Sequence, residues 1–351
     1  YAAILWENIP IVLEPSTPND RPEQKNITEV WAQIETDLND AYTDLPTEWA
    51  GDQTGRPDKG AAKGMLAKVY MQQHKWTEAK TALEYLISGA GAKYSLVANY
   101  RDNFTDVNEN NSESVFEIQY SNVSPYYNWG GATRGQGNYA IQQCGIRGLS
   151  GTSDMPYAPG WSTNLPTKDL ANAYAAGDQR KNVTVLDIDA YKSANPQFNI
   201  SYQVAPYKNT GLYNQKYLPR KGQTSGQVEL NYLNNFRIIR YSDVLLMAAE
   251  AFTKGTTVNE TKAKTYLNLV RRRAFLDNNH DITATGTALY DAILAERRLE
   301  LAMEGERFFD LVRTGKAASV LGANFKVGKH EVFPIPQTEV EISGLTQNPG
   351  Y

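Results

Sequence analysis

Cysteine and histidine are scarce in this sequence. Cys144 is the one cysteine among 351 residues, and the three histidines are His74, His280 and His330. A single cysteine excludes an internal disulfide framework and a cysteine-rich zinc site. The histidines are too scattered for the paired spacing of a metalloprotease. We therefore expect no cofactor and no metal.

Long apolar runs and an excess of positive charge are also missing. No apolar stretch approaches the roughly 20 residues that a membrane-spanning helix needs. The net charge is -4 and the isoelectric point is near 5.6, which argues against a nucleic-acid partner held by counterion release. The sequence has neither a phosphate-binding glycine loop nor a Gly-x-Ser-x-Gly motif.

Helical periodicity is present in both end regions of the chain. Residues 26–45 form an amphipathic pattern that Pro46 ends, and similar patterns cover 242–253, 259–275, 289–305 and 307–320. A further pair of helices has the spacing of a tetratricopeptide repeat. Its consensus positions are Leu66, Ala67, Tyr70, Ala79, Leu83 and Leu86. Small residues at two of these positions let the helices approach closely.

Residues 121–235 differ from the rest because they are rich in Gly, Asn, Pro, Tyr and Trp and poor in helical periodicity. A structureless loop of this length is improbable in a compact domain unless it is functional. We expect an ordered lobe with one helix near 167–176 and short strands near 115–120 and 183–187. The predicted fold is all-α, a tetratricopeptide-like helix-pair scaffold with a long loop-rich insertion. Its segments are 1–120 (helical), 121–235 (aromatic ligand lobe) and 236–351 (helical).

The stretch 294–313 has an unusual density of paired charges on a helical pattern. Glu296, Glu300 and Glu304 lie one turn apart, which would suit catalytic acids and bases. The alternative is a packed helix whose Glu and Arg side chains neutralise one another. We favour this structural interpretation, because structural ion-pair networks are commoner than catalytic ones.

The same stretch resembles the C-terminal signature of the SusD/RagB family of glycan-binding outer-membrane lipoproteins. Other segments agree with the family and follow its order. They are Trp6–Pro10, Ala61–Tyr70, Glu113–Gln119, Leu165–Leu170, Asp178–Arg180, Arg237–Leu246, Phe333–Pro336 and Asn348–Tyr351. The resemblance covers nearly the whole chain, and it makes the chain look like the later two-thirds of a longer protein whose N-terminal region carries a lipid anchor.

The resemblance implies a cell-surface protein that is not an enzyme. Such a protein captures oligosaccharide or polysaccharide and passes it to a SusC-like TonB-dependent transporter in the outer membrane, in the course of polysaccharide utilization. We expect a neutral glucan such as laminarin, because few Lys or Arg residues accompany the aromatic residues of the lobe. Arg134 and Arg147 are the nearest.

Sugar rings offer C–H patches to flat aromatic faces and a rim of hydroxyls to amides and carboxylates. The lobe supplies both kinds of partner, and glycines next to Trp129 and Trp161 leave the indole faces uncovered. The candidate ligand-binding residues are Trp129, Trp161, Tyr126, Tyr127, Asn128, Tyr139, Tyr157, Gln136, Asn138 and Asp154. The competing interpretation is that these aromatic side chains pack the core of the lobe.

Three other possibilities stay open at this point. A glycoside hydrolase of helical fold would need two carboxylates about 5 to 10 Å apart at one sugar site. A tetratricopeptide-type scaffold would bind peptides, which leaves the lobe without a purpose. The run from Asp106 to Glu117 has some of the oxygen ligands of a calcium loop, but its sixth position is Asn111 instead of glycine.

Overall fold

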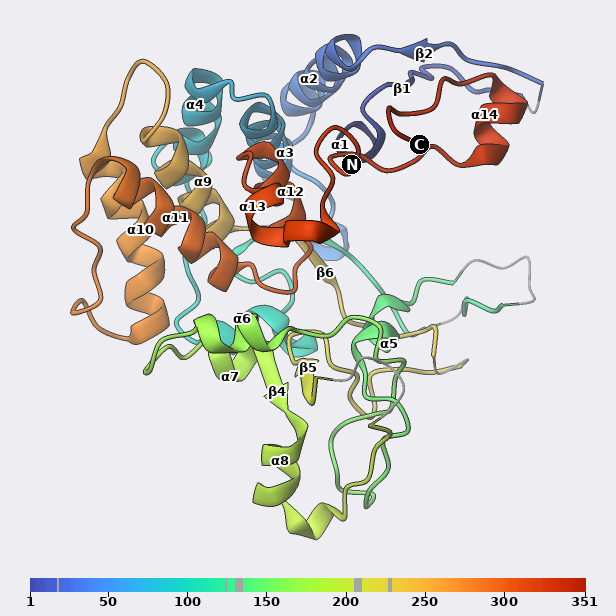
Figure 1. Ribbon diagram of the computed structural model, residues 1–351, viewed down its shortest axis with the longest axis vertical. Helices are drawn as coiled ribbons and strands as arrows, with labels where there is room; N and C mark the ends of the chain where they lie inside the picture. The colour runs from blue at the N-terminus through green and yellow to red at the C-terminus, as the bar shows by residue number, and fades with distance from the viewer. Residues whose placement is uncertain (18, 124, 130–134, 205–209, 227–228) are drawn as a thin grey trace.

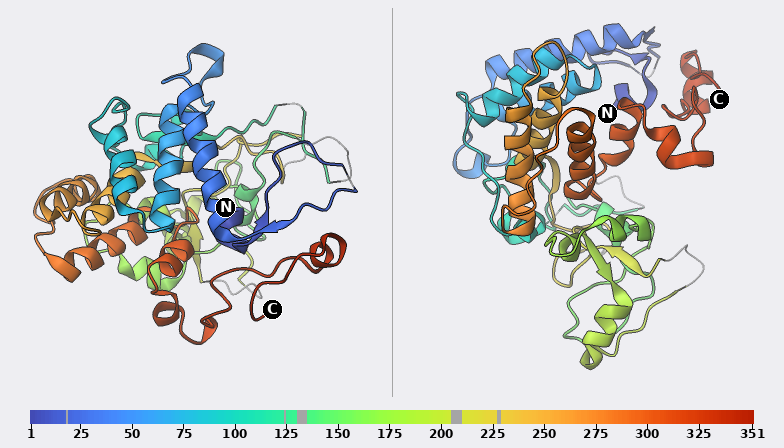
Figure 2. Two further views of the ribbon diagram at one scale, coloured as in Figure 1. Left: turned by 90° about the horizontal axis from the view of Figure 1, so that it is seen from above. Right: turned by 60° about the vertical axis from the view of Figure 1, so that its left-hand side comes forward.

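The protein consists mainly of helices, seen here in a computed structural model that describes residues 1–17, 19–123, 125–129, 135–204, 210–226 and 229–351. The longer helices lie together in the upper part of Figure 1, and the lobe, by which we mean residues 121–235, extends below them. The two views in Figure 2 show the same separation. Both chain termini lie near the helical part.

The helical part confirms most of the periodic patterns. The first of its longer helices is α2, where Asn26 and Glu29 form a capping box. The α-helices outside the lobe are α1 (Ala2–Trp6), α2 (Ile27–Asp44), α3 (Lys59–Gln72), α4 (Trp76–Ile87), α9 (Tyr241–Phe252), α10 (Glu260–Phe275), α11 (Gly286–Glu300), α12 (Arg307–Arg313), α13 (Ala317–Leu321) and α14 (Gln337–Ser343).

Helices α3 and α4 form the predicted tetratricopeptide-like pair. Ala67 and Ala79 are fully buried, and both belong to a core cluster that also contains Leu83 and Leu86. Helix α9 packs against α4, α10 and α11 and is buried along its whole length. Because the small residues admit close helix approach, these helices share one continuous core.

The single helix expected over 307–320 is wrong. The structure divides it into α12 and α13, because Gly315 takes a φ of 67° between them. A left-handed residue at this position ends a helix, and glycine takes it without steric cost. Helix α11 also ends earlier than expected, at Glu300, and a turn with Met303 and Gly305 at positive φ follows.

The described part of the lobe contains short elements that long loops connect. Thr167 caps α6 with its hydroxyl, as the predicted helix start requires. The helices are α5 (Ala140–Cys144), α6 (Lys168–Ala173), α7 (Lys181–Thr184) and α8 (Ile188–Ala194), and the strands are β4 (Val185–Asp187) and β5 (Leu212–Asn214). The strand expected over 183–187 is therefore shorter, since its first residues belong to α7.

Each sheet in the described residues is a pair of antiparallel strands. Strand β1 (Ile9–Pro10) pairs with β2 (Gln24–Lys25), and β4 pairs with β5. Strand β3 (Ser114–Ile118) pairs with β6 (Phe236–Arg240). Since β3 leads into the lobe and β6 leads out of it, this pairing closes the neck of the lobe. The short 3-10 helices are η1 (Gly51–Gln53), η2 (Tyr100–Phe104), η3 (Asp106–Asn108), η4 (Pro196–Phe198) and η5 (Gly322–Asn324).

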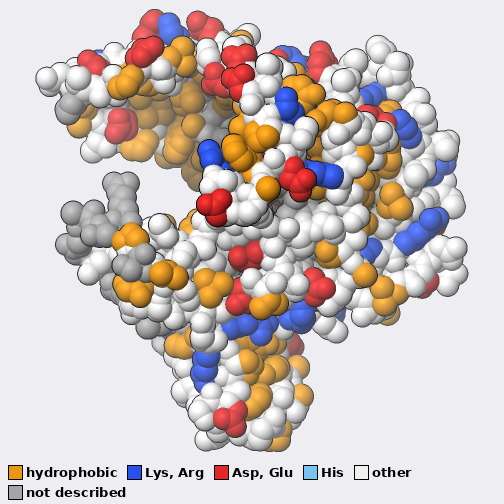
Figure 3. Space-filling view, turned by 180° about the vertical axis from the view of Figure 1, so that it is seen from behind, with side chains coloured by type: hydrophobic (Ala, Val, Ile, Leu, Met, Phe, Trp, Pro, Cys, Tyr) orange, Lys and Arg blue, Asp and Glu red, His pale blue; other side chains and the backbone are white. Residues whose placement is uncertain are grey.

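The lobe has a hydrophobic core of its own, which contains Ile146, Met155, Tyr157, Ile188 and Tyr213. Seen from behind in Figure 3, the lobe projects from the rest of the molecule, and hydrophobic side chains are exposed on it beside polar and a few charged ones. The described part of the lobe is thus ordered around this core, as its aromatic composition predicts. The division of the chain into three segments stays a prediction.

Candidate functional site

Two tryptophans that are distant in the sequence meet on the lobe. The rings of Trp129 and Trp161 lie 6.3 Å apart between centroids with an angle of 29°. Tyr127 contacts Trp129 edge-on, at 5.9 Å and 83°. Trp129 is 57% exposed, so a large part of its indole is open to solvent. Three of the sequence-predicted residues therefore form one aromatic cluster.

The spacing of this cluster restricts how a ligand could use it. Carbon atoms in contact are about 3.5 to 4 Å apart, so a sugar between two parallel rings needs roughly 7 to 8 Å. The centroids of Trp129 and Trp161 are 6.3 Å apart. A sugar therefore cannot enter between the two indoles in this arrangement. It can stack on the exposed indole of Trp129.

Trp161 is held through its backbone. Its N–H donates to the carbonyl of Gln142 in α5 at 2.8 Å, and its carbonyl accepts from Nε and Nη2 of Arg147 at 3.3 and 3.2 Å. A Cβ on Gly160 would lie 2.4 Å from Cα of Gly145. The glycine before Trp161 therefore permits a close crossing of two chain segments.

The segment that carries Trp129 is held by an asparagine that the sequence analysis did not single out. Asn231 accepts from the backbone N–H of Tyr127 at 2.9 Å and donates to the carbonyl of Tyr127 at 3.2 Å. Gly135 lies against this segment, since a Cβ there would be 1.7 Å from the Tyr127 nitrogen. No spacing rule connects residues so distant in sequence, so the pattern alone gave no signal for Asn231.

The remaining aromatic candidates fall into two groups. Tyr126 is 40% exposed and Tyr139 is 49% exposed, and the ring of Tyr126 lies against Gly226. Tyr157 is only 4% exposed and belongs to the core of the lobe. Its hydroxyl accepts from Nε2 of Gln215 at 3.2 Å. Tyr157 therefore occupies the position that the core-packing interpretation describes.

The polar candidates are also divided. Asn128, Gln136 and Asp154 are exposed, and the carboxylate of Asp154 accepts from the Ser153 hydroxyl at 2.8 Å. Asn138 is 2% exposed, and its side chain bonds to the Asn234 carbonyl and the Ala140 N–H. Asn138 therefore shapes the loop that precedes α5. Gly130, Gly131 and Arg134 lie outside the described residues.

The charged helix predicted from 294–313 is buried and internally paired. Glu296, Glu300 and Glu304 are 1%, 0% and 7% exposed. Arg180 of the lobe contacts Glu296 and Glu300 at 2.6 and 3.1 Å, and Arg240 contacts Glu300 and Glu304 at 2.9 and 2.8 Å. These contacts agree with the structural interpretation of the helix.

The pKa values in this network follow from burial and pairing. Burial alone would raise the pKa of Glu300, but the nearby cations Arg273, Arg240 and Arg180 lower it well below its usual range. Burial lowers the pKa of Lys216 to about 8, although Glu304 beside it acts in the opposite direction. Glu300 is thus held as a carboxylate, which does not suit a catalytic acid that must give up a proton near neutral pH.

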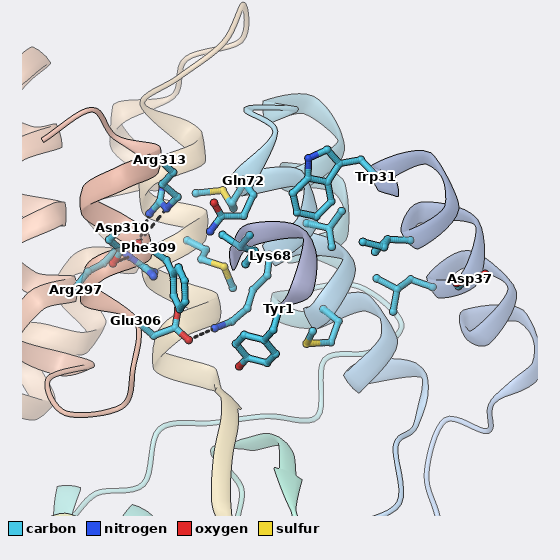
Figure 4. Close-up of a pocket in the computed structure, with 17 residues that line it drawn as sticks. Tyr1, Trp31, Asp37, Lys68, Gln72, Arg297, Glu306, Phe309, Asp310 and Arg313 are labelled. Atoms are coloured by element: carbon cyan, nitrogen blue, oxygen red, sulfur yellow. Dashed lines mark hydrogen bonds and ion pairs between the residues drawn. The ribbon is translucent and has the colours of Figure 1, made fainter. Parts of the chain in front are cut away.

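An apolar pocket of about 300 Å³ lies between α1, α2, α3 and α12. Figure 4 shows Glu306 paired with Lys68, and Asp310 beside Arg297 and Arg313. The carboxylates of Glu306 and Asp310 are thus neutralised by cations. One wall of the pocket is formed by the apolar face of α2, which includes Trp31, Ile34 and Leu38.

In the structure, Glu117, the last residue of the suggested calcium loop, is bound by protein side chains. Oε2 of Glu117 accepts from the amide of Asn235 at 3.0 Å, and Arg237 lies 3.6 Å from Oε1 of Glu117. Among the described residues there is no group of acidic, histidine or cysteine side chains that would hold a metal ion. The Asp106–Glu117 run instead forms η3, a turn and strand β3.

Comparison with known proteins gives the family. A model described as the SusD family matches residues 112–351. The chain belongs to the SusD family. In the described part of the chain, no helix combines the length and the apolar character that crossing a membrane requires.

Solved structures of SusD-like proteins share the fold over the whole chain. A laminarin-binding SusD-like protein is 36% identical, with a TM-score of 0.86 over 99% of this chain and 75% of that one. Surface glycan-binding protein A from Bacteroides thetaiotaomicron, solved with laminarihexaose, is 29% identical, with a TM-score of 0.85 over 99% of this chain and 74% of that one. The predicted SusD-like helical fold is confirmed.

Among curated relatives, SusD-like protein P2 from Formosa agariphila is 26% identical over 348 residues. The match covers 92% of this chain and 65% of that protein. The chain thus spans slightly less than two thirds of the length of this SusD-like relative.

Proposed function

We propose that this protein binds glycan without catalysis and that Trp129 and Trp161 form its stacking surface. The observation that carries the proposal is the contact between these two indoles on the lobe, with Trp129 largely exposed. A large exposed aromatic ring is costly to leave in water unless a partner covers it. Tyr126, Tyr127 and Tyr139 are further candidates for the same surface, together with Asn128, Gln136 and Asp154.

The proposed ligand is a neutral glucan, with laminarin as the first choice. Two of the similar solved structures are described as a laminarin-binding protein and a complex with laminarihexaose. The side chains that make up the aromatic cluster are uncharged, and the guanidinium of the neighbouring Arg147 is engaged by the Trp161 carbonyl. A sulfated or uronic chain would need cations that face the ligand.

The proposed role is capture at the cell surface followed by delivery to a TonB-dependent transporter. The full-length protein would be lipid-anchored in the outer membrane, with the helices facing the transporter and the lobe facing the ligand. Each aromatic contact contributes on the order of 1 kcal/mol, so micromolar to millimolar dissociation constants follow. Such weak binding suits a protein that has to release its cargo. Co-purification of the full-length protein with its transporter tests the partnership.

Affinity electrophoresis tests the ligand and the surface together. Native gels containing laminarin, other neutral glucans, a sulfated polysaccharide or a uronic polymer are run with the wild type, Trp129→Ala and Trp161→Ala. Laminarin should retard the wild type, and each substitution should weaken binding by roughly 1 to 3 kcal/mol. Added salt should have little effect, because a neutral sugar offers no charge to screen.

Thermal melts of the same variants separate binding from folding. Retention that is unchanged in both tryptophan variants would contradict the proposal, and melting temperatures that collapse in both would favour core packing. The hydrolase alternative is tested by incubating the purified protein with laminarin. Release of reducing ends that persists through purification would show that the protein is an enzyme.

A further inference from the structure

The dipeptide Asn231–Tyr232 contacts the segment that carries Trp129 and also helix α5, to which the backbone of Trp161 is bonded. Asn231 is 1% exposed and bonds both backbone groups of Tyr127 through its amide. Tyr232 is fully buried, and its hydroxyl donates to Oε1 of Gln142 at 3.1 Å. The carbonyl of Gln142 in turn accepts the N–H of Trp161 at 2.8 Å.

The geometry points to Asn231–Tyr232 as the positioning element of the stacking surface, and we propose that it sets the contact between Trp129 and Trp161. This inference rests on the proposed function, because it assigns a purpose to the surface that the tryptophans form. Neither residue of the dipeptide has to touch the ligand. Each acts through the segment that it holds.

On the Trp129 side, the amide of Asn231 makes the two backbone hydrogen bonds that a neighbouring strand would otherwise make. It satisfies the N–H and the carbonyl of one residue at once, which a short loop otherwise has to leave to water. Tyr127 then fixes Trp129 through the edge-on contact of their rings. Gly137 lets its own segment cross close to the dipeptide, because a Cβ there would lie 2.2 Å from Cα of Asn231.

On the Trp161 side, the dipeptide is tied to α5 and its flanking loop. The carbonyl of Tyr232 accepts the N–H of Asn138 at 2.8 Å, two residues before α5 begins. The hydroxyl of Tyr232 reaches Gln142 within the helix. A buried polar network in which the members satisfy one another favours a single arrangement. The position of Trp161 therefore depends on Tyr232, the direct chain neighbour of the residue that holds the Trp129 side.

The test uses a matched pair of buried asparagines. Asn231→Ala removes the two bonds to Tyr127. Asn268 in α10 makes the same kind of pair, since its amide donates to the Ile282 carbonyl at 3.1 Å and accepts the Ile282 N–H at 2.8 Å. Asn268→Ala thus removes equivalent bonds in the helical part, away from the lobe. Both variants are compared with the wild type in thermal melts and in affinity electrophoresis on laminarin.

A spectroscopic signal reports the tryptophan contact without any ligand. Two indoles in contact couple their excitations and give a pair of far-ultraviolet circular dichroism bands of opposite sign. Trp129→Phe identifies this signal, because it removes one of the two indoles. We expect Asn231→Ala to weaken the signal and to lower laminarin affinity roughly fivefold to tenfold, the loss that follows when one stacking ring is displaced. Asn268→Ala should retain both.

The possible outcomes decide the inference. Retention of the signal and of the affinity in Asn231→Ala overturns it, as does an equal loss of both in Asn268→Ala. If Asn231→Ala does not fold, Tyr232→Phe decides, because it keeps the ring and removes only the hydroxyl. An unchanged signal in Tyr232→Phe would then overturn the inference. If the wild type binds no glycan but the signal responds to Asn231→Ala, the positioning role stands while the proposed function fails.

Discussion

Nη1 of Arg180 lies 2.6 Å from Oε1 of Glu296, although the two residues are 116 positions apart. Arg180 belongs to the lobe and Glu296 to helix α11, and each is at most 1% exposed. The lobe is therefore joined to the helices by a buried ion pair, in addition to the strand pairing at its neck. Removing one partner of such a pair leaves an uncompensated charge, which is costly.

The first prediction concerns this network. Glu300→Gln should destabilise the protein by about 3 to 5 kcal/mol, because the guanidiniums of Arg180, Arg240 and Arg273 lose a shared carboxylate. The variant should still bind laminarin in affinity electrophoresis, measured well below its melting temperature. Glu78→Gln, at an exposed position of α4, is the control for charge loss alone. Lost retention with an unchanged melting curve would mean that Glu300 acts at the ligand site.

A second prediction separates the two tyrosine environments of the lobe. Tyr157→Ala should destabilise by about 3 to 5 kcal/mol, since it empties a position in a packed core. Tyr139→Ala changes a side chain that is 49% exposed, so its melting temperature should stay close to that of the wild type. Chemical denaturation of both variants measures the difference. Equal stability of the two proteins would contradict the burial of Tyr157.

The third prediction concerns the helix pair α3–α4. Ala67→Leu should destabilise by about 1 to 3 kcal/mol, because Ala67 is fully buried in the core and extra methylenes force neighbouring side chains out of position. Ala92→Leu makes the same change at an exposed position and should be nearly neutral. Urea unfolding curves for the two variants give the comparison, and similar midpoints would speak against close packing at Ala67.

The fourth prediction is a loss of stability in acid. Burial would raise the pKa of Asp243, but Lys68 and Arg297 together lower it to about 2. A carboxyl with a depressed pKa in the folded state stabilises the fold above its unfolded pKa, near 3.9, and this contribution is lost as pH falls through the folded value. The melting temperature should therefore fall between about pH 5 and pH 2, by an amount corresponding to on the order of 2 kcal/mol for this group.

Asp243→Asn is the variant that isolates this contribution. It lacks the titrating carboxyl, so it should be less stable than the wild type at pH 7, and the difference should shrink toward pH 2. Parallel melts at several pH values below 6 measure both slopes. A constant difference between the two proteins over this range would show that Asp243 does not titrate as described.

The helices could be predicted from sequence because their signals are local. Asn259 caps α10 through its side chain, as the pattern indicates. The break between α12 and α13 was missed because helix-forming residues such as Ala317 and Ala318 resume directly after Gly315, and only the positive φ reveals the end. The stripe on α2 gave the helix correctly but not its surroundings, since Trp31 and Leu38 face a pocket instead of a filled core.

The site was predictable in composition and less so in arrangement. A tryptophan next to glycine directs attention to Trp129 and Trp161, but nothing in the spacing states that their rings meet. Tyr157 belongs to the same loop-rich lobe, between Pro156 and Ala158, and is buried. Asn231 was not singled out because its role depends on a contact with Tyr127, 104 positions away. Long-range contacts of this kind are set by the fold and leave no periodic trace.

The buried cations also set a condition for exchanging specificities between relatives. A lobe transplanted from another member of the family would have to bring its own equivalents of Arg180 and Lys216, because Glu296, Glu300 and Glu304 on the recipient would otherwise each lose one of their buried counterions. A chimera joined at the neck strands β3 and β6 would keep the backbone pairing between these strands. It would still be destabilised if the new lobe lacked the two cations. Compatible donors can therefore be selected by these two positions before any sugar contact is considered.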